Sequence, residues 1–163
     1  MTTVALAFKT RNDLPVETRE AMVALLNRQL ANLVDLHSQT KHAHWNVKGE
    51  QFIALHKLYD ELAEALEHYI DDVAERAVAL GGYARGTLRM AAAGTEIAEF
   101  PEDVVNGLAV TDALAARYAE AARAMRAAIE VATHANDLDT ADLLTEISRG
   151  LDKWLWFLEA HLQ

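Results

Sequence analysis

The strongest constraint on the fold is the long segment from Gln51 to Leu80, in which apolar residues recur with the period of an α-helix. Comparable apolar stripes run over about 15–46, 110–135 and 140–162. Short turns join the first of these segments to the second and the third to the fourth, whereas the connection over 83–106 is long. Four long helices with one long crossover predict an all-α four-helix bundle.

Local signals predict where the helices begin and end. Asn12 or Asp13 is expected to cap the first helix, and Pro15 suits its first turn. The pair Gly81–Gly82 is expected to end the second helix with a left-handed C-cap, and Asp139 to cap the last helix.

The remaining organisation is simple. Residues 13–163 are interpreted as one domain, residues 1–12 as a flexible tail, and a short helix is expected near 96–100. No cysteine is present, which excludes disulfide scaffolds and cysteine-based zinc sites. The N-terminus does not resemble a signal peptide and no segment is apolar enough to span a membrane, so a cytoplasmic location is expected.

The segment from Gln51 to Leu80 carries two pairs of metal-binding residue types. His56 and Asp60 are four apart, as are Asp71 and Glu75, so each pair lies on one face of the helix. On a helical wheel all four point away from the apolar stripe. Imidazole and carboxylate together suit iron, manganese or zinc.

An exposed polar face is the simplest interpretation of these four residues. The same sector of the wheel, however, contains Ile53, Ala63, Ala74 and Val78, so it is not simply polar. An outward face of mixed character predicts a surface that packs on another molecule.

The spacing of the two pairs favours a site shared between two chains. Asp60 and Asp71 are eleven residues apart, about 16 Å along a helix axis, so one chain cannot bring both pairs to one compact site. An antiparallel copy, related by a twofold axis near Ala65–Leu66, would bring His56 and Asp60 of one chain to Asp71 and Glu75 of the other.

The stretch TKHAHWN, residues 40–46, offers further candidate ligands. His44 lies on the apolar stripe of its helix and only three residues before the turn, so it can reach His56. His42 points about 160° away on the wheel and is expected to be a surface side chain. His37 is interpreted as a buried or interface histidine, with ligation as the alternative.

These residues together resemble the Dps family, the mini-ferritins of bacteria. The resemblance rests on TKHAHWNVKGEQFIALHKLYDEL, DDVAERAVALGG and TADLLTEISRGLDKWLWFLEAH, and it covers most of the chain. The absence of any Glu-x-x-His motif, which ordinary ferritins use inside one bundle, agrees with a site shared between subunits.

The resemblance implies a ferritin-like bundle that assembles into a hollow homo-dodecamer of tetrahedral symmetry. It implies metal sites at the twofold interfaces, with His44, His56 and Asp60 from one chain and Asp71 and Glu75 from its neighbour. It implies ferroxidase activity: Fe(II) is oxidised, preferably by hydrogen peroxide, and stored as ferric mineral. Zinc or manganese are possible substitutes for iron.

Further roles follow from the resemblance with weaker support in the sequence. Trp45 is a candidate to intercept stray oxidising equivalents, with an interface aromatic as the equal alternative. Asp137, Asp139 and Asp142, with Glu146 deeper, are candidates to line a threefold pore. For Asp139 the competing interpretation is the helix cap described above.

Two rival functions remain at this point. A DNA-binding nucleoid protein is disfavoured, because the formal net charge is -10 and residues 1–12 contain only Lys9 and Arg11 as basic residues. DNA binding is therefore expected to be weak or absent. A shell or structural bundle without iron chemistry is disfavoured because all five candidate ligands are present.

Overall fold

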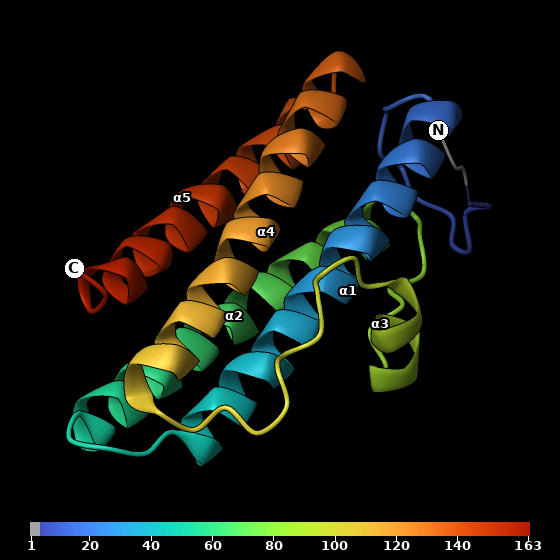
Figure 1. Ribbon diagram of the computed structural model, residues 1–163. Helices are drawn as coiled ribbons and strands as arrows, with labels where there is room; N and C mark the ends of the chain where they lie inside the picture. Colours follow the sequence, from blue (N-terminus) through green and yellow to red (C-terminus); the bar gives the residue numbers. More distant parts are fainter. Residues whose placement is uncertain (1–3) are drawn as a thin grey trace.

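A computed structural model describes residues 4–163, which form five α-helices (Figure 1). The long helices are α1 (Val16–Asn46), α2 (Phe52–Ala79), α4 (Gly107–His134) and α5 (Leu138–Ala160), and the short one is α3 (Leu88–Gly94). α1 packs mainly on α2 and α4 mainly on α5, while the crossover with α3 lies beside α1. The predicted four-helix bundle with one long crossover is confirmed.

The core is built from leucines of all four long helices together with two buried tyrosines. The Tyr59 hydroxyl lies 2.7 Å from Thr111 Oγ1, and the Tyr118 hydroxyl lies 3.4 Å from Thr40 Oγ1. Burial raises the pKa of both tyrosine hydroxyls. Truncation of one of these buried leucines to alanine should lower the free energy of unfolding by about 2–5 kcal/mol. The packing of these side chains holds α1 and α2 in one register.

The ends of α1 and α2 differ in how well they were predicted. No side chain caps α1, which begins directly after Pro15; Asn12 Oδ1 instead accepts a hydrogen bond from the Leu14 N–H at 3.0 Å. The cap predicted from Asn12 or Asp13 is therefore wrong. Gly81 has φ of 89° directly after α2, which confirms the left-handed C-cap.

The cap of α5 is Asp137, and the prediction of Asp139 is wrong. Asp137 Oδ1 accepts hydrogen bonds from the Thr140 N–H at 3.0 Å and from Arg76 Nη2 at 2.7 Å. Both aspartates have the right chemistry for a cap. Arg76 of α2 selects between them, because its guanidinium reaches the buried Asp137.

The short helix of the crossover lies earlier than predicted. α3 is capped by Thr87 Oγ1, which accepts from the Met90 N–H at 3.4 Å. Residues 96–100, where the helix was expected, form no helix. Their backbone is instead held by side chains of the bundle: Asn32 Oδ1 accepts from the Glu96 N–H at 2.8 Å, and Gln39 Nε2 donates to the Ala98 carbonyl at 3.1 Å.

Residues 4–12 pack against the bundle, so the prediction of a flexible tail is wrong for them. The N–H groups of Ala7 and Phe8 both donate to the Gly81 carbonyl, at 2.9 and 3.0 Å. A Cβ at Gly81 would lie 2.8 Å from the Phe8 carbonyl oxygen, so this close approach also favours glycine. Residues 1–3, the start of the predicted tail, lie outside the described residues.

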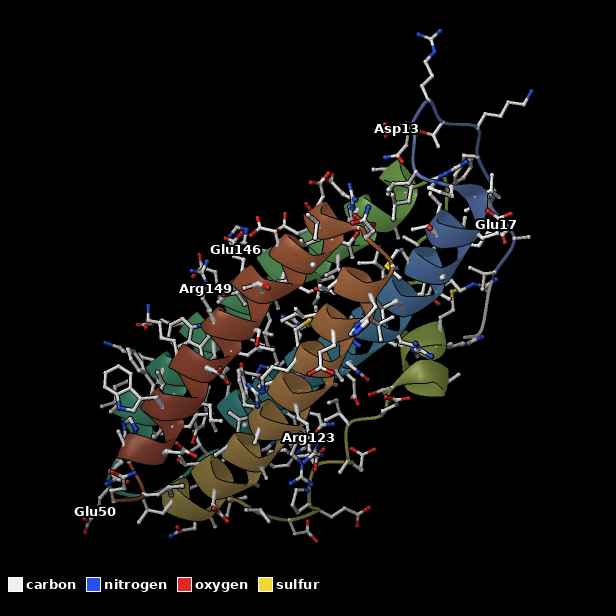
Figure 2. The ribbon with its side chains drawn as sticks, turned by 90° about the horizontal axis from the view of Figure 1, so that it is seen from above. Asp13, Glu17, Glu50, Arg123, Glu146 and Arg149 are labelled. Atoms are coloured by element: carbon white, nitrogen blue, oxygen red, sulfur yellow. The ribbon has the colours of Figure 1, made fainter. Side chains whose placement is uncertain are left out.

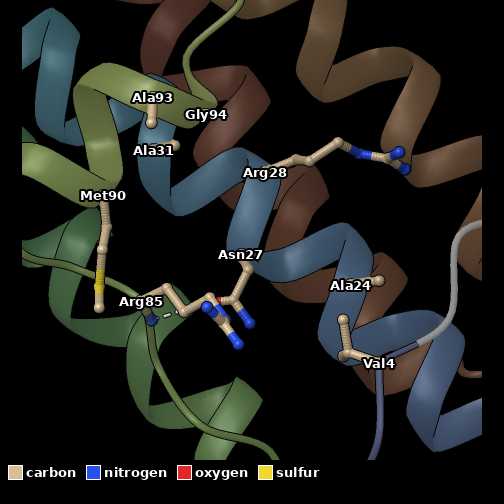
Figure 3. A pocket seen from close by; sticks show the side chains of 9 residues that line it. All are labelled: Val4, Ala24, Asn27, Arg28, Ala31, Arg85, Met90, Ala93 and Gly94. Carbon is tan, nitrogen blue, oxygen red and sulfur yellow. Dashed lines mark hydrogen bonds between the residues drawn. The ribbon is translucent and has the colours of Figure 1, made fainter.

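The outer faces of the long helices are charged, as Glu146 and Arg149 on α5 and Arg123 on α4 illustrate (Figure 2). A groove of about 380 Å³ lies between α1, α3 and the N-terminal segment (Figure 3). Val4 and Met90 contribute to its mainly apolar lining. Across residues 4–163, no helix has the length and apolar character that a membrane span requires.

Candidate metal site

The two predicted histidine ligands face each other across the α1–α2 pair. The rings of His44 and His56 stack with centroids 3.7 Å apart and planes inclined by 21°. His44 Nδ1 lies 2.7 Å from the carbonyl oxygen of His56, and His56 Nδ1 lies 2.9 Å from the carbonyl oxygen of His44. The prediction that His44 reaches the start of the second helix is confirmed.

This reciprocal pairing fixes which ring nitrogen of each histidine donates a hydrogen bond to the backbone. A carbonyl oxygen can only accept a hydrogen bond, so each Nδ1 must carry the proton and donate it. In a neutral imidazole the proton on Nδ1 leaves the Nε2 lone pair free. Backbone carbonyls that hold one ring nitrogen are a common way to orient a histidine for metal binding through the other. His44 and His56 thus have the tautomer that a metal ligand needs.

Asp60 lies one helical turn beyond His56 and faces the same region. Its Oδ1 is 3.9 Å from His44 Nδ1 and 2.6 Å from Lys41 Nζ. The hydrogen bond from Lys41 lowers the pKa of the Asp60 carboxyl, with the positive charge of Lys41 adding to the effect. Asp60 is therefore a charged, exposed carboxylate beside the histidine pair and a candidate metal ligand.

Lys41 is the residue of this region that the sequence analysis missed. It lies three residues before His44, on the same face of α1, just as Asp60 lies four residues after His56 on α2. Because α1 and α2 are antiparallel, these offsets bring the two side chains together. The spacing could have indicated Lys41 once His44 was chosen as the ligand.

The other candidates in the TKHAHWN stretch lie outside the histidine pair. His42 is exposed, which confirms the surface position that the wheel predicted, and its ring lies 5.3 Å from that of Phe100 in the crossover. Trp45 is 65% exposed on the chain surface. His37 Nε2 lies 3.4 Å from Glu67 Oε1, which gives it a partly buried position on the α1–α2 seam.

The second ligand pair, Asp71 and Glu75, lies further along the outward face of α2. Both side chains are exposed, and within residues 4–163 neither makes a hydrogen bond or an ion pair. Glu75 borders a shallow depression formed with Ala74 and Val78. These two carboxylates are available to a group that approaches α2 from outside.

The outward face of α2 has the mixed character that the sequence predicted, with one exception. Ile53 and Val78 are exposed and Ala74 is half-buried. Ala63 is buried, so its predicted place on this face is wrong. Apolar side chains at both ends of the face surround the two ligand pairs, and exposed apolar residues beside charged ones are typical of contact surfaces.

The two ligand pairs remain apart within one chain. Eleven residues of continuous helix separate Asp60 from Asp71, about 16 Å along the axis. Within the described part of the chain, no three side chains of His, Asp or Glu type are grouped closely enough to hold a metal ion.

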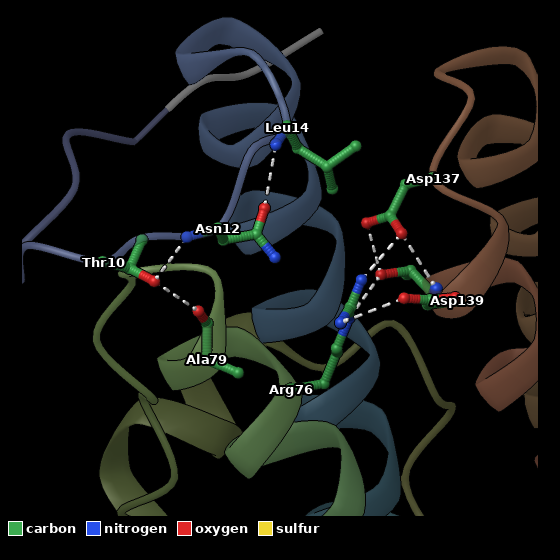
Figure 4. A network of polar contacts seen from close by, with 8 residues as sticks. Thr10, Asn12, Leu14, Arg76, Ala79, Asp137 and Asp139 are labelled. Carbon is green, nitrogen blue, oxygen red and sulfur yellow. Dashed lines mark hydrogen bonds and ion pairs between the residues drawn. The ribbon is translucent and has the colours of Figure 1, made fainter.

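The candidate pore residues have different surroundings. Asp137 is buried and bound to Arg76 and Thr140, so its carboxylate has a structural role within the chain (Figure 4). Asp139 is exposed and lies 4.0 Å from Arg76 Nη1. Asp142 is exposed on α5, as is Glu146.

Comparisons with known proteins agree with this architecture. The family model described as "Ferritin-like domain" matches residues 23–163. A relative from Agrobacterium fabrum, named "DNA protection during starvation protein", is 46% identical over 155 residues, which cover 95% of this chain and 96% of the relative. The chain belongs to the Dps family of ferritin-like proteins.

Solved Dps structures have the same fold. DpsA14 from Streptomyces coelicolor matches with a TM-score of 0.92 at 36% identity, over 98% of this chain and 95% of that one. A Dps protein from Vibrio cholerae O1 matches with a TM-score of 0.88 at 25% identity, over 99% and 100% of the two chains. That protein is described as a member of a broad superfamily of ferritin-like diiron-carboxylate proteins.

Proposed function

We propose that this Dps chain assembles into a homo-dodecameric shell that oxidises Fe(II) and stores the ferric product. The observation that carries the proposal is the His44–His56 pair, in which both Nδ1 atoms are held by backbone carbonyls and Asp60 Oδ1 lies 3.9 Å from His44 Nδ1. Two neutral imidazoles and a carboxylate form an incomplete ligand set for iron. Asp71 and Glu75 of a second chain would complete it.

A twofold axis supplies those carboxylates without any change in the helix. His56 and Glu75 are equally far from the point between Ala65 and Leu66, and so are Asp60 and Asp71. Two antiparallel α2 helices that cross at this level therefore bring each histidine pair to a carboxylate pair of the neighbour. Because a twofold contact is reciprocal, each interface would contain two identical sites.

The reaction we propose uses hydrogen peroxide as the preferred oxidant. Two Fe(II) ions each give up one electron, the O–O bond breaks, and two protons are taken up, so that two Fe(III) ions and two water molecules result. Delivery of both electrons in one event avoids the hydroxyl radical that a single electron would release. Carboxylates favour Fe(III), so the three carboxylates of the shared site stabilise the product.

Mixed shells would test the shared site directly. His56→Ala shells and Asp71→Ala shells should each be inactive in peroxide-driven Fe(II) oxidation. When the two variants are unfolded together and reassembled at random, half of the interfaces are mixed and each mixed interface contains one intact site. About a quarter of the wild-type activity should therefore return.

The control for this experiment is reassembly of each variant alone, followed by mixing of intact shells without exchange of subunits. Neither preparation should recover activity. A site contained in one chain would give no recovery in the mixed shells either, since every chain would carry a lesion, and that result would overturn the proposal.

Protection of DNA, in this proposal, comes from the removal of iron and peroxide. The net charge of -10 per chain opposes contact with phosphate. Binding to linear DNA should therefore be undetectable in a gel shift at physiological salt. A shift that weakens steeply as salt is raised would favour the alternative, a nucleoid protein that protects DNA by association. The cytoplasmic location stays a prediction.

A further inference from the structure

The groove of about 380 Å³ between α1, α3 and the N-terminal segment lies away from the candidate metal site. Ala24 and Ala31 of α1 form its floor, and Val4 and Met90 lie at its sides (Figure 3). Ala31 precedes Lys41 by ten residues, about 15 Å along α1. Because the alanine side chains are small, this stretch of α1 stays open, and the resulting volume is typical of a small-molecule site.

The charged residues of this groove all carry the same sign. Its lining, within residues 4–163, includes Arg28 and Arg85 but no aspartate or glutamate. Neither arginine forms an ion pair in that part of the chain. The guanidinium of Arg85 lies beside Asn27, whereas that of Arg28 extends away from the groove (Figure 3). The groove therefore combines an apolar floor with an unpaired positive charge, in a chain whose net charge is -10.

Hydrogen bonds to α1 hold the backbone of Arg85 in this position. Its N–H donates to Asn27 Oδ1 at 2.7 Å, and Asn27 Nδ2 donates to the carbonyl oxygens of Val23 and Tyr83 at 2.9 and 3.1 Å. These bonds use the amide of Asn27, so the Arg85 guanidinium is the donor that a ligand can reach. A guanidinium pairs with a carboxylate through two parallel N–H···O bonds, which are stronger than those between neutral groups.

We propose that the groove binds a free medium-chain carboxylate, whose anionic group contacts Arg85 and whose alkyl chain covers Ala24 and Ala31. The apolar floor sets the chain length, because these two alanines are about 10 Å apart along α1. An extended chain of eight carbons is about 9 Å long, given C–C bonds of about 1.5 Å. Longer chains would leave the groove. This site is independent of the proposed iron chemistry.

Methyl NMR of assembled shells with ¹³C-labelled methionine methyl groups tests the proposal, with sodium octanoate as the probe. Met90 lines the groove and is 38% exposed, whereas Met22 and Met125 are buried in the bundle core. Octanoate should shift the methyl signal of Met90, assigned with Met90→Leu, and leave the signals of the two buried methionines in place.

The length of the alkyl chain gives a second measurement in the same experiment. Hexanoate should bind about 4- to 15-fold more weakly than octanoate, because it buries two fewer methylene groups. Decanoate should bind within about twofold of octanoate, since its additional methylene groups would lie outside the groove. Affinity that keeps rising at the same rate from octanoate to decanoate would contradict a groove of this length.

Two pairs of variants separate the groove from the rest of the surface. Arg85→Gln should weaken octanoate binding at least about tenfold, through loss of the charged hydrogen bonds. Arg89→Gln removes an exposed arginine that does not line the groove and should change the affinity by less than about twofold. Ala93→Phe should block binding by filling the groove, and Ala92→Phe, at the adjacent exposed position, should not.

Each contrary result would overturn the proposal. A Met90 signal that does not move in assembled shells would mean that a neighbouring subunit covers the groove or that the groove does not bind octanoate. Equal affinities in wild type and Arg85→Gln would mean that the positive charge selects no carboxylate. Sedimentation checks that the variants assemble, and Ala93→Leu, compared with Ala92→Leu, replaces the phenylalanine pair if either variant of that pair does not.

Discussion

The two halves of the proposed iron site are built in opposite ways. The half that contains His44, His56 and Asp60 is held together by contacts within the chain. These are the two hydrogen bonds from the histidines to the backbone and the ion pair of Lys41 with Asp60. The half that contains Asp71 and Glu75 consists of exposed carboxylates on one helix, without polar partners in residues 4–163.

This difference follows from what each ligand type requires. An imidazole must have the correct tautomer and orientation before it can bind a metal, and the backbone of a neighbouring helix can impose both. A carboxylate at neutral pH is an acceptor with either oxygen, so it needs only to be brought to the right place. Assembly can supply that placement. Contacts within one chain therefore orient the two histidines, whereas contact between two chains would place Asp71 and Glu75.

The largest expected effect on the oxidation rate comes from the half that contains Asp71 and Glu75. Asp71→Ala should reduce peroxide-driven Fe(II) oxidation by at least about 100-fold, because loss of a ligand exceeds the 10- to 100-fold typical of an outer-shell partner. The unfolding temperature of the subunit should not change, since Asp71 is exposed and makes no hydrogen bond. Stopped-flow absorbance and calorimetry measure the two quantities.

Asp72→Ala is the matched control for this prediction. Asp72 is the adjacent exposed carboxylate of α2, but it points about 100° away on the helix. Its removal should change the rate by less than about twofold. Equal losses in the two variants would mean that general negative charge, and not a ligand at position 71, drives the oxidation.

In the half that contains His44 and His56, substitutions of two neighbouring histidines should have different effects on the oxidation rate. His44→Ala should lower the oxidation rate by about 100-fold, the upper end of the outer-shell range, because it removes a ligand and the stacking partner of His56. His42→Ala should leave the rate within about twofold, since its ring faces Phe100. Oxidation rates of the two variants, measured at the same iron loading, decide this. A loss in His42→Ala as deep as that in His44→Ala would contradict the geometry described here.

The smallest expected effect concerns how the stability contributed by the Lys41–Asp60 ion pair depends on pH. Lys41 lowers the pKa of Asp60, so the ion pair stabilises the folded chain above the ordinary aspartate pKa of about 3.9. That contribution is lost as the pH falls through the lowered pKa. In Lys41→Met the pKa of Asp60 should rise, as a carbon-detected NMR titration of the carboxyl group would show. An Asp60 pKa that is unchanged in Lys41→Met would show that the Lys41–Asp60 ion pair does not form in solution.

Much of the site could be predicted from the sequence because its geometry is local to one helix. The four-residue spacings in α2 place His56 with Asp60 and Asp71 with Glu75, and the distance between the pairs favours two chains over one. The choice of His44 over His42 also follows from helical geometry, since the two rings point in widely different directions. The ligand roles of all five residues remain predictions.

The errors arose where a distant part of the chain selects between local alternatives. Asp137 and Asp139 are equally good caps by local chemistry, and Arg76 of α2 decides between them. Residues 96–100 form no helix, because their backbone makes hydrogen bonds with Asn32 and Gln39 of α1 instead. The N-terminal segment is ordered by the Gly81 carbonyl at the far end of α2.

The sequence by itself determined the four long helices, the outward face of α2 and the twofold spacing of its ligands, because helical periodicity is a property of neighbouring residues. The sequence also predicted that His44 can reach His56, but only the tertiary structure decided in detail how α1 and α2 are aligned. That alignment depends on the packing of the buried leucines, and it brings His44 onto His56 and Lys41 onto Asp60. The tautomer of the histidines and the fixed charge at the site follow from these long-range contacts.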